Sequence, residues 1–400
     1  MKAGWQTKNL GDVCDVVGGG TPPKGRAAFY SGDIPWATVR DLKQEVITST
    51  EFKITKEAVK SSATNIIPSG NVVIATRVGL GKVCLLGQDT AINQDLRGII
   101  PLNTKTLDVR FLFWWLKSIA DLIVAEGTGA TVQGVKLPFV KSLQVPLPPL
   151  PEQQRIVGIL DAAFDGIATA KANAEKNLQN ARALFESHLQ SVFSQRGEGW
   201  VEKLLEASTS IINGFAFKSG DFSPNAEVKC IKITNVGVRE FVCESDSYLP
   251  ADFVTKYDAF SIKSGSIVLA LTRTIISGGL KVAVVPENYD RALLNQRVAA
   301  IITNPNLLIA PFLFAYLSTQ SVVDYVKERV NTLMQPNLSI NDLRSMPIPL
   351  PPVHEQEQIT NQISALRNET KRLESLCQRK LAALDEFKKS LLHQAFSGAL

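Results

Sequence analysis

The chain has 400 residues, of which 45% are hydrophobic and 20% are charged, and its formal net charge is +5. This length predicts two or more domains, and the apolar content excludes an intrinsically disordered protein. No apolar run approaches the roughly 20 residues that span a bilayer, and the first residues lack the hydrophobic segment of a signal peptide, so we expect a cytoplasmic protein without membrane contact.

Strand-like runs such as "NVVIAT", separated by turn residues, and an amphipathic helix around "FLFWWL" (Phe111–Leu116) predict a mixed α/β domain over residues 1–150. A proline-rich segment then introduces a long helix over residues 151–196. Strand-like runs return, "GSIVLAL" among them, and predict a second α/β domain over residues 197–350. A second proline-rich segment introduces the last predicted helix, over residues 351–400.

The chain contains an internal repeat. "VPLPPLPEQQRIVGIL" is followed by "IPLPPVHEQEQITNQI", in which Ile359 aligns with Ile156, 203 residues earlier. "FLFWWL" likewise corresponds to "FLFAYL", "INQ" to "LNQ", and "IATR" to "LALTR". Similarity at a fixed offset predicts two copies of one structural unit, each made of a domain and a helix.

Both long helices carry a hydrophobic repeat with alternating steps of four and three residues, which is typical of a coiled-coil seam. The predicted seam positions are Ile156, Leu160, Ala163, Ile167, Ala170, Ala174, Asn177, Ala181, Leu184 and His188 in the first helix and Ile359, Ile363, Leu366, Thr370, Leu373, Cys377, Lys380, Leu384, Phe387 and Leu391 in the second. Antiparallel pairing buries both seams without a long return loop. We therefore predict an α+β fold with two similar α/β domains separated by an antiparallel two-helix coiled coil with pseudo-twofold symmetry.

The prolines fit this arrangement, because proline cannot continue a helix but is tolerated before one and in its first turn. Glu152 stands near a helix start, where the helix dipole favours a negative charge. A polyproline ligand for an SH3-like partner is the alternative interpretation, and the repetition at two helix starts disfavours it.

Catalytic and metal-binding patterns are missing from the sequence. The five cysteines form no CxxC pair, and the three histidines belong to no HExxH motif. "GGGTPPK" lacks the GK[ST] ending of a phosphate-binding loop, and no nucleophile or methyltransferase motif is present. We therefore expect no catalytic residue, no metal site and no cofactor bound by this chain.

The positive charge is concentrated in residues 1–150, which carry 17 basic and 12 acidic residues. An excess of this size favours a polyanionic partner, although a solvated surface explains it equally well. Two similar domains without chemistry therefore indicate a protein that recognises two separate sites.

"PLPPLPEQQRIVGILD" followed by a heptad helix resembles the conserved region of specificity (S) subunits of type I restriction–modification systems. The segments at Gly11–Leu42 and Asn213–Val236 look like the starts of their target-recognition domains, and the resemblance covers essentially the whole chain. It implies a non-catalytic subunit that binds a bipartite site in double-stranded DNA, one half to each domain. It also implies helices that dock two methyltransferase (M) subunits, and restriction (R) subunits that join the complex. S-adenosylmethionine, ATP and Mg are then expected on those partners.

Residues that differ between the repeats are the better candidates for base readout, because the two domains are expected to read different half-sites. The predicted DNA contacts are Lys24, Arg26, Lys82, Gln133 and Lys136 in the first domain and Lys218, Lys281, Gln335 and Asn337 in the second. Arg77 and Arg273, each preceded by threonine, are assigned to the fold or to phosphate positioning. Arg40, Lys232 and Asn235 are secondary candidates at strand ends. For each of these, a solvated surface role is the alternative.

Apolar residues outside the seam need a cover that a two-helix pair does not provide. Candidate contacts with M subunits are Phe164, Phe185, Phe193, Leu376 and Phe396, with packing against the chain's own domains as the alternative. Two other functions stay open at this point: a coiled-coil scaffold whose domains bind protein, and a divergent enzyme with unrecognised motifs.

Overall fold

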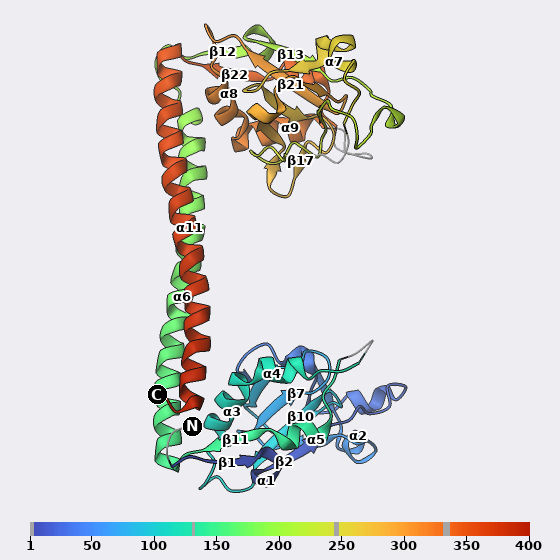
Figure 1. Ribbon diagram of the computed structural model, residues 1–400, viewed down its shortest axis with the longest axis vertical. Helices are drawn as coiled ribbons and strands as arrows, with labels where there is room; N and C mark the ends of the chain where they lie inside the picture. Colours follow the sequence, from blue (N-terminus) through green and yellow to red (C-terminus); the bar gives the residue numbers. More distant parts are fainter. Residues whose placement is uncertain (1–3, 130–132, 244–247, 331–336) are drawn as a thin grey trace. The chain divides into compact units, whose positions relative to one another are not determined.

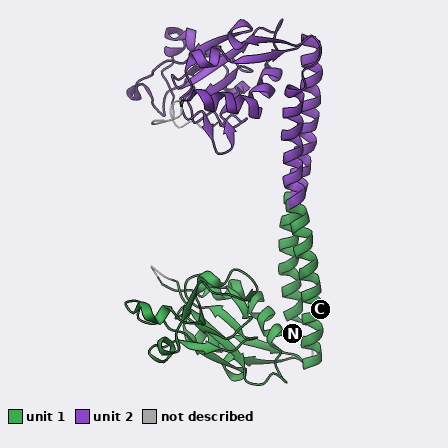
Figure 2. Cartoon of the chain, turned by 180° about the vertical axis from the view of Figure 1, so that it is seen from behind, with its two compact units in different colours: residues 1–175, 378–400 green, residues 176–377 purple. Residues whose placement is uncertain are grey.

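The computed structural model describes residues 4–129, 133–243, 248–330 and 337–400. The chain divides into two compact units, which Figure 2 distinguishes by colour. Unit 1 contains residues 1–175 and 378–400, and unit 2 contains residues 176–377. Each unit therefore combines one α/β domain with a part of both long helices.

The domain of unit 1 is built on two sheets and a buried helix (Figure 1). One sheet has the order β2 (Cys14–Gly18), β10 (Leu96–Pro101), β7 (Val72–Ala75), β8 (Val83–Leu86) and β4 (Val46–Ile47). The other has the order β5 (Phe52–Ile54), β3 (Ile34–Ala37), β9 (Thr90–Ile92) and β6 (Asn65–Ile67). A separate pair joins β1 (Gln6–Asn9) to β11 (Gln144–Leu147). The helices are α1 (Leu10–Val13), α2 (Lys56–Lys60), α3 (Val109–Ser118), α4 (Ala120–Ala125) and α5 (Leu137–Ser142).

The domain of unit 2 repeats this plan. Its main sheet has the order β13 (Thr209–Asn213), β21 (Val298–Thr303), β16 (Ile267–Ala270) and β19 (Val282–Val284). The smaller sheets are β14 (Cys230–Ile231), β20 (Ala292–Leu294) and β15 (Ser261–Ile262), then β12 (Val201–Leu204) with β22 (Pro347–Leu350), and β17 (Ile275–Ile276) with β18 (Gly279–Leu280). Its helices are α7 (Phe253–Lys256), α8 (Ala310–Leu317), α9 (Gln320–Arg329) and α10 (Ile340–Arg344).

The predicted repeat is confirmed by matching strand pairs. β3 pairs with β9 in parallel through Trp36 and Ala91, and β14 pairs with β20 in parallel through Cys230 and Leu293. The helix α3 buries all of "FLFWWL" in the core of unit 1, as expected, and its copy α8 contributes to the core of unit 2. Asp108 caps α3 by accepting hydrogen bonds from two backbone N–H groups of its first turn.

The two long helices are α6 (Leu150–Ser194) and α11 (Val353–Ser397), each of 45 residues. The proline-rich segments form β11 and β22 and pass directly into these helices. Within the part of the chain that the structure describes, no helix combines the length and apolar character needed to cross a membrane.

A buried glutamine fixes the start of each long helix to its domain. The Gln153 side chain accepts the Asp108 N–H at 2.8 Å and donates to the carbonyl oxygens of Thr106 and Pro148. Gln356 makes the same three bonds, to the Ile309 N–H and to the carbonyl oxygens of Leu307 and Pro351. Both side chains are fully buried. These glutamines belong to the repeated "PEQQ" and "HEQE" segments, and they align the domain residues of the two units at an offset of 201.

The long helices pair antiparallel, as expected, and this is seen inside each unit. In unit 1, Arg155 on α6 donates to the carbonyl oxygen of Leu400, and Lys171 pairs with Asp385, so residue numbers rise along one helix as they fall along the other. In unit 2, Arg182 pairs with Glu374 at 3.2 Å. Exposed ion pairs contribute little stability, and the buried apolar side chains between the helices contribute more.

The predicted seam is right throughout one of its two alternating series, and in the other it is right near the start of each helix, where Ile156 is fully buried, and wrong farther along. Buried seam positions that agree with the prediction are Leu160, Ile167, Ala174, Ala181, Ile363, Thr370 and Leu391. The predicted positions Asn177, Leu184, Leu373, Lys380 and Phe387 are exposed. The covered position comes one residue later, as at Phe185, Glu374 and Lys388. Within each unit the α/β domain packs against the helix pair and draws the buried stripe toward itself, which a heptad count does not register.

Candidate nucleic-acid interface

A cavity of about 600 Å³ opens on the domain of unit 1. It lies where the parallel strands β3 and β9 end, because Thr38–Arg40 and Asn93–Asp95 follow those strands and line it. Carboxyl ends of parallel strands commonly carry binding residues. We call this cavity the unit 1 cleft.

Aromatic rings form one wall of the unit 1 cleft. Trp36 is buried, and its indole N–H donates to the carbonyl oxygen of Gly20 at 3.2 Å. The Tyr30 hydroxyl donates to the carbonyl oxygen of Pro22 at 2.7 Å, and the ring stands edge-on to Trp36. Phe52 continues the row and is 39% exposed. These bonds hold flat apolar surfaces at a fixed orientation beside a polar rim.

The rim carries cationic and amide side chains. Arg40 is exposed and pairs with Glu51 at 3.7 Å, while Thr21 donates a short hydrogen bond to the amide oxygen of Gln94. Asp95 accepts from the Asn93 amide at 2.9 Å and pairs with Arg77 at 3.7 Å. A rim that offers both hydrogen-bond donors and hydrogen-bond acceptors can bind phosphates and base edges.

Several predicted contacts of the first domain therefore come together. Lys24 and Arg40 line the cleft, and Arg77 reaches it through Asp95. Gln133 lies next to Gly134, which forms a β-bridge with Arg77. The remaining predicted contacts, Arg26, Lys82 and Lys136, are exposed outside the cleft lining. The Arg26 guanidinium stands 5.4 Å from the ring centre of Phe29.

Sequence reasoning missed the aromatic wall and Arg97. Trp36 opens the segment "WATVRDL", and an aromatic residue at the end of a strand was the available signal. Arg97 is half-buried, and burial lowers the pKa of its guanidinium, with the nearby Arg77 charge lowering it further. The Asp95 carboxylate partly offsets this effect, and the two arginines together leave a positive charge that can attract a phosphate.

Aromatic side chains gather at the corresponding place in unit 2. Cys230 on β14 occupies the place of Trp36 on β3, because each pairs with the equivalent parallel strand. Phe215 occupies the place of Gly20, because its N–H donates to the carbonyl oxygen of Leu294 as that of Gly20 donates to the carbonyl oxygen of Ile92. The Phe215 ring packs 4.6 Å from Tyr257 and 5.3 Å from Phe260, measured between ring centres. The two domains thus share a backbone plan and present different surfaces at it.

The predicted contacts of the second domain differ in how accessible they are. Lys218, Arg273 and Asn337 are exposed. The Lys281 ammonium donates to the carbonyl oxygen of Ile233 at 2.5 Å, and burial lowers its pKa, with repulsion from Arg273 adding to the effect. The Lys232 ammonium stands 5.2 Å from the ring centre of Phe222. The prediction for Gln335 falls outside the described residues.

The structure corrects the prediction for Asn235. Its side chain is fully buried, accepts the backbone N–H of Lys232 at 2.9 Å and donates to the carbonyl oxygen of Val242 at 2.8 Å. A buried amide that closes a loop cannot reach a base edge. Asn235 is therefore a structural residue.

The structure also corrects the alignment of Arg77 with Arg273. The carbonyl oxygens of Thr76 and Leu271 accept equivalent hydrogen bonds, from the N–H groups of Val135 and Leu338. In the repeat, Arg77 therefore corresponds to Thr272. Arg273 instead matches Val78, and both have a positive φ, of 50° and 40°. Because strand β16 reaches its last residue one position earlier in the shared motif, the two arginines leave the sheet at different points. They are not copies of one residue.

The predicted M-subunit contacts fall into two groups. Phe164, Phe185 and Phe193 are buried against the chain's own domains, which is the alternative weighed for them. Phe396 is half-buried and stacks edge-on against Phe111 at 5.1 Å. Leu376 is 47% exposed.

Three of the cysteines, Cys14, Cys84 and Cys230, are buried, whereas Cys243 is exposed. Burial raises the pKa of Cys14 and of Cys230 to about 12 and the pKa of Cys84 to about 11. Within the described residues no group of three or more potential ligands is placed to hold a metal ion.

Comparisons with known proteins place this architecture in a family. The family model described as "Type I restriction modification DNA specificity domain" matches residues 2–179 and 198–380. The chain belongs to this family of type I restriction–modification specificity proteins. The match of two family domains confirms the interpretation as a specificity subunit rather than an enzyme.

Relatives and solved structures match part or all of the chain. The chain is 27% identical to the type I restriction enzyme MjaVIII specificity subunit of Methanocaldococcus jannaschii, over 99% of this chain and 93% of that one. It is 35% identical over 170 residues, 41% of each chain, to the EcoR124I/EcoR124II specificity subunit of Escherichia coli. The fold resembles the HsdS subunit from Thermoanaerobacter tengcongensis, with a TM-score of 0.66, 19% identity, and 100% of this chain and 98% of that one covered. A chain from a structure of type I R-M complex assembly gives a TM-score of 0.79 at 18% identity, over 100% of this chain and 99% of that one.

Proposed function

We propose that each α/β domain reads one half of a bipartite site in double-stranded DNA. In this proposal, residues 1–150 and 197–350 are the two target-recognition domains. Residues 151–196 and 351–400 are the helical spacer that sets the distance between the half-sites. The family supplies the DNA-specificity role, and the division of labour between the domains is our inference.

The difference between the domains at equivalent strand ends carries this proposal. Unit 1 offers an open cleft with an aromatic wall, and unit 2 packs aromatic rings at the corresponding strands. Two domains with one backbone plan and different surfaces suit two different half-sites. Direct readout requires side chains that differ in this way, whereas phosphate contacts tolerate any sequence.

We assign base or phosphate contacts to individual residues according to the exposure of their side chains. In unit 1 we assign base readout to Lys24, Arg40 and Gln133 and phosphate contact to Arg77. In unit 2 we assign base or phosphate contact to the exposed side chains Lys218, Arg273 and Asn337. Arg26, Lys82, Lys136, Lys232, Lys281 and Gln335 remain further candidates.

The helices are proposed to dock two M subunits, which bind S-adenosylmethionine, and R subunits join them with ATP and Mg in the cytoplasm. Exposed leucine and phenylalanine side chains on the helices support this part of the proposal. They are Leu184, Leu373, Leu376 and Phe387, between 47% and 59% exposed. Apolar side chains on the outside of a helix pair are typical of a surface that a partner covers.

The test is an exchange of the variable segment of one domain. We expect that replacing residues 18–30 with the matching segment of a relative of different specificity changes one half of the methylated sequence and leaves the other intact. Adenine methylation is mapped across a genome that expresses the M subunit with either chain. A simultaneous change in both halves contradicts the assignment of one half to each domain. Loss of all methylation with an unchanged melting temperature contradicts it as well.

A further inference from the structure

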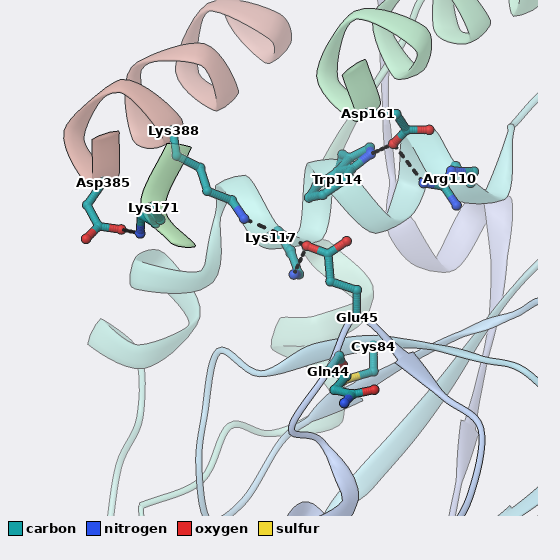
Figure 3. A network of polar contacts seen from close by, with 10 residues as sticks. All are labelled: Gln44, Glu45, Cys84, Arg110, Trp114, Lys117, Asp161, Lys171, Asp385 and Lys388. Carbon is teal, nitrogen blue, oxygen red and sulfur yellow. Dashed lines mark hydrogen bonds and ion pairs between the residues drawn. The ribbon is translucent and has the colours of Figure 1, made fainter. Parts of the chain in front are cut away.

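The place where each α/β domain meets the helix pair is filled differently in the two units. In unit 1, Asp161 on α6 accepts hydrogen bonds from the Trp114 indole and from Arg110, each at 2.8 Å (Figure 3). The Trp114 ring packs 4.6 Å from the ring of Phe164, measured between centres. This polar and aromatic contact closes the junction in unit 1.

A cation on the second helix completes the junction of unit 1. The Lys388 ammonium on α11 lies 4.6 Å from the ring centre of Phe164 and 5.8 Å from that of Trp114. The carboxylate of Glu45 pairs with Lys388 at 3.7 Å and with Lys117 at 3.1 Å, as Figure 3 shows. The chain itself therefore supplies this cation with an aromatic surface and with a carboxylate.

The repeat identifies the corresponding residues in unit 2. The buried Gln153 and Gln356, which we call the glutamine clamps, bind equivalent backbone groups just before α3 and α8. This equivalence aligns the two helices, so Ala315 corresponds to Trp114 of unit 1. On the long helices the offset of 203 places Arg367 at the position of Phe164 and Phe185 at the position of Lys388. The aromatic ring and the cation have exchanged positions in the repeat, although in both units the ring is on α6 and the cation on α11, and the indole is missing.

A cavity of about 410 Å³ occupies this junction in unit 2. Its lining is mostly apolar and includes Phe185, Leu189, Phe314, Ala315, Ile363 and Arg367. Cavities of this size and character are typical binding sites for an aromatic or aliphatic group. We call it the unit 2 junction cavity.

The charged groups around this cavity are paired differently from those in unit 1. Arg239 is engaged by Glu186 through both of its terminal nitrogens and by the carbonyl oxygen of Ser318. Arg367 is half-buried, and among the residues that the structure describes its guanidinium has no hydrogen-bond or ion-pair partner. Burial lowers the pKa of Arg367, repulsion from Arg239 adds to the effect, and attraction to Glu186 partly opposes it. The Glu186 carboxylate that acts on Arg367 is already engaged by Arg239, so the Arg367 guanidinium can pair with a carboxylate that a partner supplies.

We propose that the unit 2 junction cavity receives an aromatic side chain of an M subunit, together with a neighbouring carboxylate that pairs with Arg367. The proposal rests on the proposed docking of M subunits to the helices and adds the position and the chemistry of one contact. In unit 1, Trp114 and Glu45 play these two parts inside the chain. The two M subunits therefore meet different junctions on one specificity chain.

The position of the cavity favours a protein over a small molecule. Six of its lining residues belong to the long helices: Phe185, Leu189, Thr360, Ile363, Ser364 and Arg367. Leu184, next to Phe185 on α6, is 59% exposed, so this part of the helix also carries apolar surface outside the cavity. A partner that covers this helix surface can insert one ring and present one carboxylate.

The first test compares two substitutions with a matched control. Ala315→Trp fills the cavity as Trp114 fills it in unit 1, and Arg367→Met removes the charge. Arg372→Met removes a charge from the same helix at an exposed position that is paired with Glu369. Titration of the M subunit, followed by mass photometry, is expected to show two bound subunits for the control and for the unaltered chain. We expect either cavity variant to weaken one of the two binding steps at least about tenfold and to leave the other unchanged.

Folding is checked by thermal unfolding. We expect Ala315→Trp not to lower the melting temperature, because the indole fills a cavity. Normal binding of two M subunits by both folded variants overturns the proposal. Equal weakening of both steps overturns it too. Absence of M binding even by the unaltered chain instead removes the proposed docking role, so the two failures are distinguishable.

A second test identifies the occupant. A photoreactive phenylalanine at Ser364, which lines the cavity and is exposed, is expected to cross-link to the M subunit in the assembled complex. A cross-link only to a second copy of this chain, or none, overturns the proposal. If indole-3-acetate binds the isolated chain, and the two substitutions abolish that binding without affecting M, the occupant is a small aromatic acid and the proposal is wrong.

Discussion

The two units show what a duplicated chain preserves and what it changes. The glutamine clamps at Gln153 and Gln356 make the same three hydrogen bonds, and the parallel strand pairs keep one register. The surface at those strand ends differs completely, with an open cleft in one unit and packed rings in the other. The shared hydrogen bonds are constrained because buried backbone N–H and carbonyl groups need partners. The side chains at the strand ends are free to vary with the partner that they recognise.

The junctions with the helices show the same division. Trp114 and Ala315 stand at one position of one repeated helix, yet the first closes the junction and the second leaves a cavity. A charged side chain reaches the helix pair from both domains, but it is Glu45 in unit 1 and Arg239 in unit 2. The repeat therefore retains the architecture while it changes both volume and charge.

We expect the largest effect from a change in the helix pair, which the two units share. Inserting one heptad into α6 and one into α11 lengthens a helix by about 10 Å, which corresponds to roughly three base pairs. We expect the recognised half-sites to stay the same while their spacer grows by that amount, as seen by methylation mapping. An unchanged spacer would show that the helices do not set the distance. Insertion of one heptad in α6 alone serves as the control, since it breaks the antiparallel register.

Removing a glutamine clamp tests whether the two units are equivalent where they look identical. Gln153→Ala leaves one buried N–H and two carbonyl oxygens without their partner, so we expect a loss of about 3 kcal/mol in the free energy of unfolding. Gln356→Ala is expected to cost a similar amount. Urea denaturation measures both, with the exposed neighbours Gln154→Ala and Gln358→Ala as controls. A large cost at only one site would reveal a hidden difference between the units.

Single arginines test the independence of the two surfaces. Arg40→Ala is expected to weaken DNA binding by the complex about tenfold and to relax one half-site. Arg273→Ala is expected to affect only the other half-site. Competition with oligonucleotides altered in one half at a time, at constant salt, measures both effects. Lys389→Ala, an exposed change on α11, is the control.

The buried thiols distinguish the units by pH. Burial raises the pKa of Cys14 to about 12 and of Cys84 to about 11 in unit 1, and of Cys230 to about 12 in unit 2, from an ordinary value of 9.0. A raised pKa means that the stabilising contribution is complete below pH 9 and is lost as the pH rises toward the folded-state value. At pH 10 we expect a loss of about 1 kcal/mol for each buried thiol. Urea denaturation at pH 8 and pH 10 measures it, and Cys230→Ala is expected to abolish the share of unit 2. A pH dependence that survives this substitution in full would contradict the assignment.

The sequence by itself determined the repeat, the order of domains and helices, and the antiparallel pairing of the helices. These features depend on local patterns: hydrophobic period, proline at helix starts, and recurrence at a constant offset. The buried "FLFWWL" helix follows from the same kind of pattern. The family resemblance also lies in contiguous segments, which is why it was visible without a structure.

Only the tertiary structure decided the phase of the seam, the burial of Asn235 and the different exits of Arg77 and Arg273. Each depends on which distant segment packs against a residue, and a heptad or a shared tripeptide is compatible with more than one answer. The cavity beside Ala315 shows this most clearly, because a small residue in a helix does not reveal whether its neighbours close the space. Packing is a property of contacts between elements, and those contacts are formed only in the folded chain.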